Sequence, residues 1–88
     1  MEDSVLENWR KRIDELDDQL LEIISQRMQM SRKIGKHKKE NNLPFLDTKR
    51  RSKVINKNLS KADLLLLPKI FVKELFTLIH NYSLEIQK

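Results

Sequence analysis

The composition of this 88-residue chain excludes several classes of protein, because it has no cysteine, one glycine, two prolines and 35% charged residues. The length fits one domain, residues 1–88. So short a chain hides only about two thirds of its unfolded surface, and we expect a partner chain to complete its core. Without cysteine there is no disulfide framework or thiolate metal site, and we expect no metal and no cofactor. The longest apolar run, residues 64–67, is far shorter than a membrane helix of roughly 20 residues, which predicts a soluble, cytoplasmic protein.

The formal net charge of +5 is unevenly placed along the chain. Residues 1–26 hold eight acidic and three basic side chains, whereas residues 27–53 hold ten basic and two acidic ones. Such a basic block attracts nucleic acid, an anionic membrane or a small polyanionic ligand, and charge alone does not choose among the three.

Three helices account for almost all of the sequence, which predicts an all-α fold with one long and two shorter helices. The first runs from Val5 to about Asn41. This stretch has no proline, its apolar residues are spaced three and four apart, and Ser4 with Glu7 resembles a capping box. At 1.5 Å per residue a helix of about 37 residues is about 55 Å long, roughly twice the diameter of a globule of this size. Two shorter helices cannot cover it, so we expect an intertwined, domain-swapped homodimer that forms a helical bundle.

The two shorter helices are delimited by turn residues and prolines. The Asn-Asn-Leu-Pro segment at residues 41–44 ends the first helix, because asparagine favours turns and proline lacks an amide donor. Asp47 is then the expected N-cap of a second helix that runs to about Leu59 or slightly further. Pro68 is expected in the first turn of a third helix, with a competing start at Ser60.

Two cations lie on the apolar side of the first helix. In a heptad reading, Arg27 shares a stripe with Ile13, Leu20 and Ile34. A guanidinium there snorkels to solvent, pairs with a carboxylate of the partner helix, or lines a cavity that receives an anion. Lys38 follows eleven residues later, within about 20° of the same direction. Lys38 belongs to a run of basic residues, most of which must face solvent. Its alignment with Arg27 distinguishes it from the other basic residues of that run.

Further polar residues stand near the two ends of the chain and at the start of the second helix. Arg10 is too distant to join the two cations of its own helix, but in an antiparallel pair of long helices it approaches those of the partner. Ser83 and Gln87 are four apart and share a helix face, although polar residues near a C-terminus are commonly just exposed. Asp47 and Arg50 are three apart, where Asp47 most simply caps the helix and Arg50 most simply faces water. No catalytic triad and no phosphate-binding glycine loop is visible.

Taken together, these positions resemble the all-helical chorismate mutases of the AroQ class, also called type II. The match covers nearly the whole chain without a gap. The specific set is one arginine, a second seventeen residues later, a lysine eleven further on, an Asp-x-x-Arg motif and a terminal Ser-x-x-x-Gln motif. These residues are Arg10, Arg27, Lys38, Asp47 with Arg50, and Ser83 with Gln87.

The resemblance implies an isomerase that converts chorismate to prephenate in phenylalanine and tyrosine biosynthesis, in two active sites that are each built from both chains. Arg27 and the Arg10 that reaches across from the partner chain would hold the two carboxylates of chorismate, while Lys38 and Gln87 would address its ether oxygen. The reaction is an intramolecular Claisen rearrangement, which needs no nucleophile and no proton transfer. Clamping the substrate and placing donors at the ether oxygen is therefore sufficient chemistry.

The chain departs from the family at the end of the site near the ring hydroxyl. The resemblance implies that Ser83 helps at the ring carboxylate and that Asp47 and Arg50 line the hydroxyl end. The family usually has a glutamate directly after that arginine, and this chain has Arg51, which cannot accept a hydrogen bond. We expect Asp47 or a water to take the hydroxyl, with weaker substrate binding or an altered ring-hydroxyl preference.

Three other functions remain open. Isochorismate pyruvate lyase has the same fold, and the missing glutamate and residues 80–82 favour it, whereas Asp47 and Ser83 favour the mutase. A helical dimer that binds nucleic acid would use residues 27–53, but that block lacks interleaved aromatics and does not explain Arg27 on a core stripe. A coiled-coil module without a ligand would be stabilised by Arg27→Leu. We expect chorismate and a second copy of the chain as partners, and neither nucleic acid nor a membrane.

Overall fold

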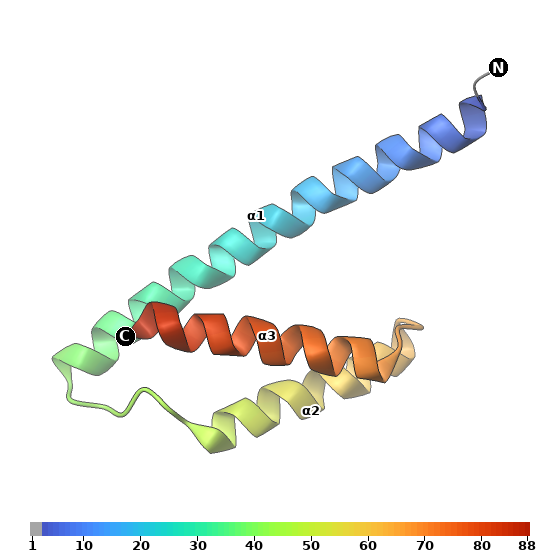
Figure 1. The fold of residues 1–88 in the computed structure, drawn as a ribbon. Helices are drawn as coiled ribbons and strands as arrows, with labels where there is room; N and C mark the ends of the chain where they lie inside the picture. Colours follow the sequence, from blue (N-terminus) through green and yellow to red (C-terminus); the bar gives the residue numbers. More distant parts are fainter. Residues whose placement is uncertain (1–2) are drawn as a thin grey trace. The chain divides into compact units, whose positions relative to one another are not determined.

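The computed structural model describes residues 3–88, which form three α-helices and no strand (Figure 1). The all-α fold with one long and two shorter helices is thereby confirmed. The chain divides into two compact units, one that ends at Met30 and one that spans Ser31–Lys88. The helices are α1 (Ser4–Glu40), α2 (Thr48–Leu64) and α3 (Lys69–Gln87).

The amino-terminal cap of α1 is one residue earlier than the sequence suggested. Oδ1 of Asp3 accepts hydrogen bonds from the backbone N–H groups of Val5 at 3.0 Å and Leu6 at 3.2 Å. The predicted capping box at Ser4 is therefore wrong, and Ser4 is the first helical residue. A carboxylate is the stronger cap here because its charge also interacts favourably with the positive end of the helix dipole.

The unit that ends at Met30 consists of one amphipathic stretch of α1, and its apolar stripe is uncovered. Ile13 is 56% exposed and Leu20 is 53% exposed, and Trp9, Leu16 and Ile23 are also exposed. A helix in a folded protein gains most of its stability by packing such a face against another element. An exposed apolar stripe of this kind would gain stability from packing against another apolar surface.

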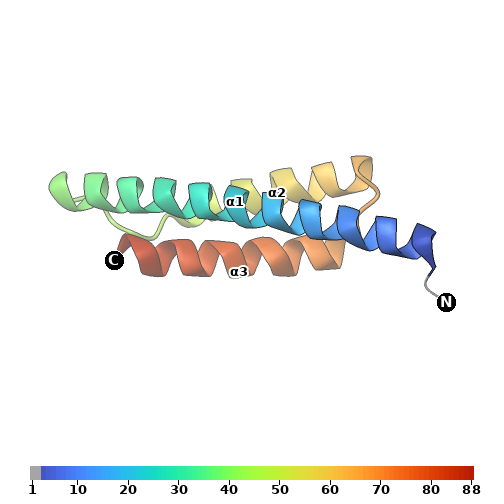
Figure 2. The ribbon, with the colours of Figure 1, turned by 90° about the horizontal axis from the view of Figure 1, so that it is seen from above.

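In the second unit, α2 and α3 lie side by side and run antiparallel (Figures 1 and 2). Ala62 of α2 and Val72 of α3 are the buried apolar residues among those that the structure describes. Larger apolar side chains of both helices are half-buried around them. They are Val54, Ile55 and Leu59 from α2, and Leu75, Phe76 and Ile79 from α3.

The connection from α1 to α2 begins at the predicted asparagines. Asn42 adopts a left-handed conformation with φ 54°, which asparagine tolerates better than most residues. The N–H of Leu43 donates to the carbonyl of Lys38 at 2.8 Å, and the N–H of Asn42 donates to that of Lys39 at 3.4 Å. These bonds make a Schellman motif, which satisfies the last carbonyls of α1 and turns the chain back.

The helix boundaries that follow agree with the sequence at α2 and differ slightly at α3. Asp47 caps α2 as predicted, since its Oδ1 accepts the N–H of Arg50 at 2.9 Å. The helix continues to Leu64, and the competing helix start at Ser60 is wrong, because Ser60 lies within α2. Pro68 is the N-cap residue of α3 and stands immediately before its first turn.

Candidate active site

The centre of the candidate site is a lysine that bridges three segments of the second unit. Nζ of Lys38, near the end of α1, donates a 2.9 Å hydrogen bond to Oε1 of Gln87 and a 2.8 Å hydrogen bond to the carbonyl of Phe45. Lys38 is half-buried and Gln87 is only 9% exposed. The structure thus brings together two of the predicted site residues that are 49 positions apart.

The chemistry of this pair follows from its hydrogen-bonding inventory. An ammonium group has three N–H donors and no acceptor. Two of the donors of Lys38 are engaged with Phe45 and Gln87, which leaves one for a ligand. The amide of Gln87 must face the ammonium through its oxygen, so its Nε2 group is turned away and can donate elsewhere. One N–H of Lys38 and the Nε2 group of Gln87, on two different helices, therefore remain as donors for a ligand.

The last turns of α1 and of α3 approach each other very closely at this pair. Gly35 is buried in α1, one turn before Lys38. A Cβ atom built on it would lie 2.6 Å from both the Cα and the carbonyl oxygen of Gln87. A side chain larger than hydrogen does not fit between the two helices at this position.

Ser83 is buried in the same part of α3, one turn before Gln87. It is 4% exposed. The simple alternative for these two residues, that they are polar residues exposed near a C-terminus, is thus excluded for this chain. Buried polar side chains are uncommon and call for a specific role, either in the packing or toward a ligand.

Asp47 and Arg50 stand together at the start of α2, and both are exposed. The carboxylate of Asp47 is engaged in capping, through its bond to the backbone of Arg50. The side chain of Arg50 is available to solvent. These positions correspond to the structural roles that sequence analysis gave them, and capping leaves Oδ2 of Asp47 as a further acceptor.

Arg51, the residue after Arg50 in α2, forms a hydrogen bond with α3. Its Nη2 donates to Oδ1 of Asn81 at 3.2 Å, and its side chain is half-buried. Sequence analysis gave Asn81 no role of its own. The contact joins residues 30 positions apart, so it depends on how α2 and α3 pack, and no spacing along one helix could have predicted it.

The two remaining predicted residues lie in the unit that ends at Met30. Arg10 is exposed and forms an ion pair with Glu7 at 3.4 Å. An exposed pair of this kind contributes at most about 1 kcal/mol, so it can be exchanged for another anion. Arg27 is half-buried in the same helix, α1.

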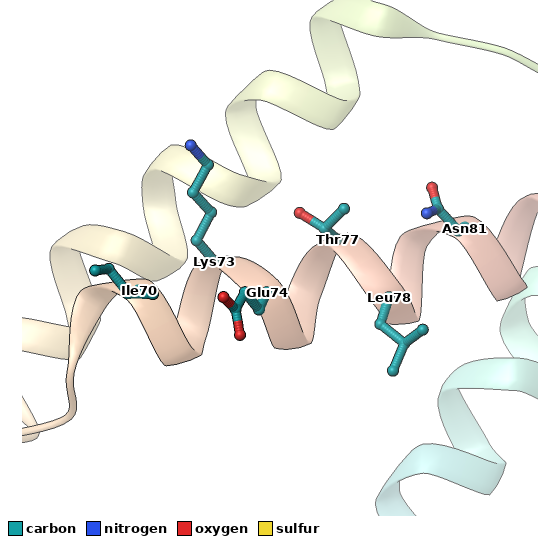
Figure 3. A pocket seen from close by; sticks show the side chains of 6 residues that line it. All are labelled: Ile70, Lys73, Glu74, Thr77, Leu78 and Asn81. Atoms are coloured by element: carbon teal, nitrogen blue, oxygen red, sulfur yellow. The ribbon is translucent and has the colours of Figure 1, made fainter.

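A shallow pocket on α3 contains none of the predicted site residues (Figure 3). All of its lining side chains come from this one helix, and four of the six are polar. Figure 3 shows Thr77 and Leu78 pointing to opposite sides of the helix. The lining residues are Ile70, Lys73, Glu74, Thr77, Leu78 and Asn81.

Residues 3–88 hold neither a metal-binding cluster nor a membrane-spanning helix. No group of three or more histidine, aspartate or glutamate side chains is arranged to hold a metal ion there. Within the same residues, none of the helices has the length and apolar character that crossing a membrane requires.

Comparison with known proteins assigns the chain to a family. None of the curated proteins matches the sequence. A solved structure described as a conserved hypothetical protein from Pyrococcus furiosus is 31% identical with a TM-score of 0.75, and the match covers 99% of this chain and 100% of that chain. The family described as type II chorismate mutase matches residues 9–88. Since that match spans almost the entire sequence, this protein belongs to the type II chorismate mutase family.

Proposed function

We propose that this protein rearranges chorismate to prephenate, and that residues 1–88 act as one functional domain in an intertwined homodimer. Membership of the type II chorismate mutase family supports the substrate and the reaction class. The observation that carries the proposal is the hydrogen bond from the half-buried Lys38 to the buried Gln87, which leaves a donor on each of the two side chains. The cysteine-free composition suits a cytoplasmic enzyme.

The proposed catalytic step is electrostatic. In the rearrangement the ether C–O bond breaks while a C–C bond forms, and the ether oxygen gains negative charge in the transition state. One N–H of Lys38 and the Nε2 group of Gln87 donate to that oxygen. Because the Lys38 bond fixes the orientation of the Gln87 amide, both donors are in place before the charge develops. Removing one such preorganised donor typically reduces kcat by about 100- to 1,000-fold.

The proposed role of the arginines is to bind the two carboxylates of the substrate. Arg27 supplies one guanidinium, and Arg10 of the partner subunit supplies the other. A guanidinium matches a carboxylate with two parallel hydrogen bonds, which fixes the flexible enolpyruvyl arm over the ring. The weak, exposed pair that Arg10 forms with Glu7 does not prevent this exchange.

The proposed ring end of the site uses the remaining residues. Ser83, a buried residue of α3, assists at the ring carboxylate. Asp47 keeps Oδ2 as an acceptor for the ring hydroxyl while its Oδ1 caps α2, and Arg50 lines the same end. Asp47 thereby takes over the task of the glutamate that Arg51 replaces.

The proposed homodimer is supported by the amount of uncovered apolar surface. The stripe of α1 is exposed from Trp9 to Ile23, and Ile70, Phe71 and Leu78 of α3 are each more than half exposed. Exposed apolar side chains on each of these two helices are typical of an interface with another chain. Pairing of two long helices would bury these stripes and supply each site with the Arg10 of the partner subunit.

The deciding experiment is an assay of purified protein with chorismate, with isochorismate run in parallel and products identified by NMR. Prephenate from chorismate supports the proposal. Pyruvate and salicylate from isochorismate, with little prephenate, would assign the lyase, which the arginine at position 51 makes the second candidate. Salt-dependent binding of DNA without turnover of either substrate would contradict both enzymatic assignments.

A further inference from the structure

Gly35 is the single glycine of the chain, and its position inside α1 needs a physical reason. Glycine is a poor residue for a helix interior, because it gains nothing from a side chain and loses the most backbone freedom. Its backbone is in the ordinary helical region, since no glycine of the described residues has a positive φ. The local conformation would therefore accept any helix-forming residue.

The reason lies across the helix interface. A Cβ at position 35 would meet the backbone of Gln87, at 2.6 Å from its Cα, 2.6 Å from its carbonyl oxygen and 3.0 Å from its carbonyl carbon. These are backbone atoms in the last turn of α3, so no rotation of a side chain can make room. The turn itself would have to move away by several tenths of an ångström.

The displaced residue would be one of the two proposed donors. Gln87 is both the residue whose backbone contacts Gly35 and the residue whose side chain accepts the 2.9 Å bond from Lys38. Gly35 and Lys38 lie one turn apart on α1. The separation of the helices at Gly35 thus sets the distance over which Lys38 reaches Gln87.

We propose that Gly35 is a positioning residue for the donor pair of Lys38 and Gln87, acting through the backbone of Gln87. The inference rests on the proposed function, because its catalytic consequence requires that the pair addresses the substrate. The structural part of the inference, that residue 35 fixes the location of Gln87, does not depend on any substrate.

Gly35→Ala tests the catalytic consequence. The substitution favours the helix itself, so a merely local role would leave the enzyme as active as before. We expect kcat to fall by about 10- to 100-fold, as for a misplacement of up to an ångström, and KM to change much less, since the carboxylate-binding arginines are elsewhere. The matched control is Lys36→Ala. Lys36 follows Gly35 in α1 and its side chain is exposed, so this substitution should leave kcat unchanged.

A double variant shows whether Gly35 acts through Gln87. In a Gln87→Ala background the donor is already lost, and Gly35→Ala should then reduce kcat by less than threefold further, whereas independent effects would multiply. Equal reductions of kcat by Gly35→Ala with and without Gln87 would overturn the proposal. Unchanged kcat in the single variant would do the same.

Two NMR measurements on the ligand-free protein separate this inference from the proposed function. In the wild-type chain, the Hα protons of Gly35 and Gln87 should show a cross-relaxation peak. The absence of this peak would overturn the inference. This measurement does not require that the Gly35→Ala variant folds. In Gly35→Ala, the side-chain amide resonances of Gln87 should shift while those of Asn56, which lies in α2, stay in place. If both results are obtained but chorismate is not converted, the proposed function is wrong and the positioning by Gly35 stands.

Discussion

The ammonium group of Lys38 donates to the side-chain oxygen of Gln87 at 2.9 Å, and this one bond decides which way the Gln87 amide faces. An ammonium offers only donors, so the amide oxygen is held toward Lys38 and the amide nitrogen points away from it. A hydroxyl or carboxylate at position 87 would accept the same bond. At neutral pH a carboxylate has no proton to donate, whereas the amide retains the N–H groups of its Nε2 and a hydroxyl retains its one O–H.

Gln87→Glu should therefore make the reaction depend on pH. At neutral pH the introduced carboxylate pairs with Lys38 and cannot donate, so we expect kcat to fall by about 100- to 1,000-fold. The Lys38 ammonium favours the charged carboxylate and lowers its pKa. Activity should thus return only as the pH falls far enough to protonate it, and kcat measured across acidic to neutral pH checks this.

The control for that prediction is Gln87→Met, which has similar length and no donor at any pH. Its kcat should be low throughout and should show no recovery in acid. If Gln87→Glu is as active as the wild-type protein at neutral pH, Gln87 does not donate to the reacting oxygen.

Much of this structure was predictable because it depends on local rules. The break at residues 41–44 and the cap at Asp47 follow from the turn and capping preferences of single residues. The partnership of Lys38 and Gln87 was suggested by the resemblance alone, since nothing in helical spacing relates positions 49 apart.

Two of the features that the sequence could not supply depend on how one helix packs against another. The bond from Arg51 to Asn81 and the contact of Gly35 with Gln87 arise where two helices pack. The misplaced cap at Ser4 is different, because Asp3 and Ser4 are both good capping residues and only the competition between them decides. The N-cap preferences of aspartate and serine are too similar to predict which of the two residues caps the helix.

Arg51→Glu should improve substrate binding if this position addresses the ring hydroxyl. The substitution restores a charged acceptor and removes a positive charge, and a hydrogen bond to a charged group contributes about 1.5–3 kcal/mol. We expect KM for chorismate to fall by about tenfold, measured by steady-state kinetics beside isochorismate. Unchanged kcat and KM would show that Arg51 does not affect the ring end.

Asn81→Ala separates the two possible causes of such an effect. It removes the partner of Arg51 but leaves the guanidinium and its charge in the chain. If the loss of the link between α2 and α3 were responsible, Asn81→Ala would reproduce the change in KM. We expect it to leave KM within about twofold of the wild-type value, since an exposed hydrogen bond contributes little.

Leu66→Gly should stabilise the fold, because Leu66 adopts a left-handed conformation with φ 57° and is 92% exposed. The strain of this conformation is roughly 1–2 kcal/mol for a residue with a Cβ and is absent in glycine. We expect the free energy of unfolding to rise by about 1 kcal/mol in denaturant titrations. The control is Leu65→Gly at φ −97°, also exposed, which should give no increase.

Mixed dimers test whether each active site is shared between two chains. Arg10→Ala and Lys38→Ala should each be inactive alone, since both remove a group that the proposed site requires. In a heterodimer, the Arg10→Ala chain still has Lys38, and the Lys38→Ala chain still has Arg10. These two residues meet in one of the two sites, which is therefore intact, while the other site lacks both. Random reassociation makes half of the dimers heterodimers, so co-refolding equal amounts should restore about a quarter of the wild-type rate.

The same experiment with Arg27→Ala in place of Arg10→Ala is its sharpest control. If Arg27 serves the site of its own chain together with Lys38, every site in such a heterodimer lacks one of the two residues. Co-refolding Arg27→Ala with Lys38→Ala should then restore nothing, although the chains pair equally well by light scattering. If activity returns in the mixture that contains Arg10→Ala but not in the one that contains Arg27→Ala, Arg10 is the residue that reaches into the site of the other subunit. If activity returns in neither mixture, each site belongs to one chain.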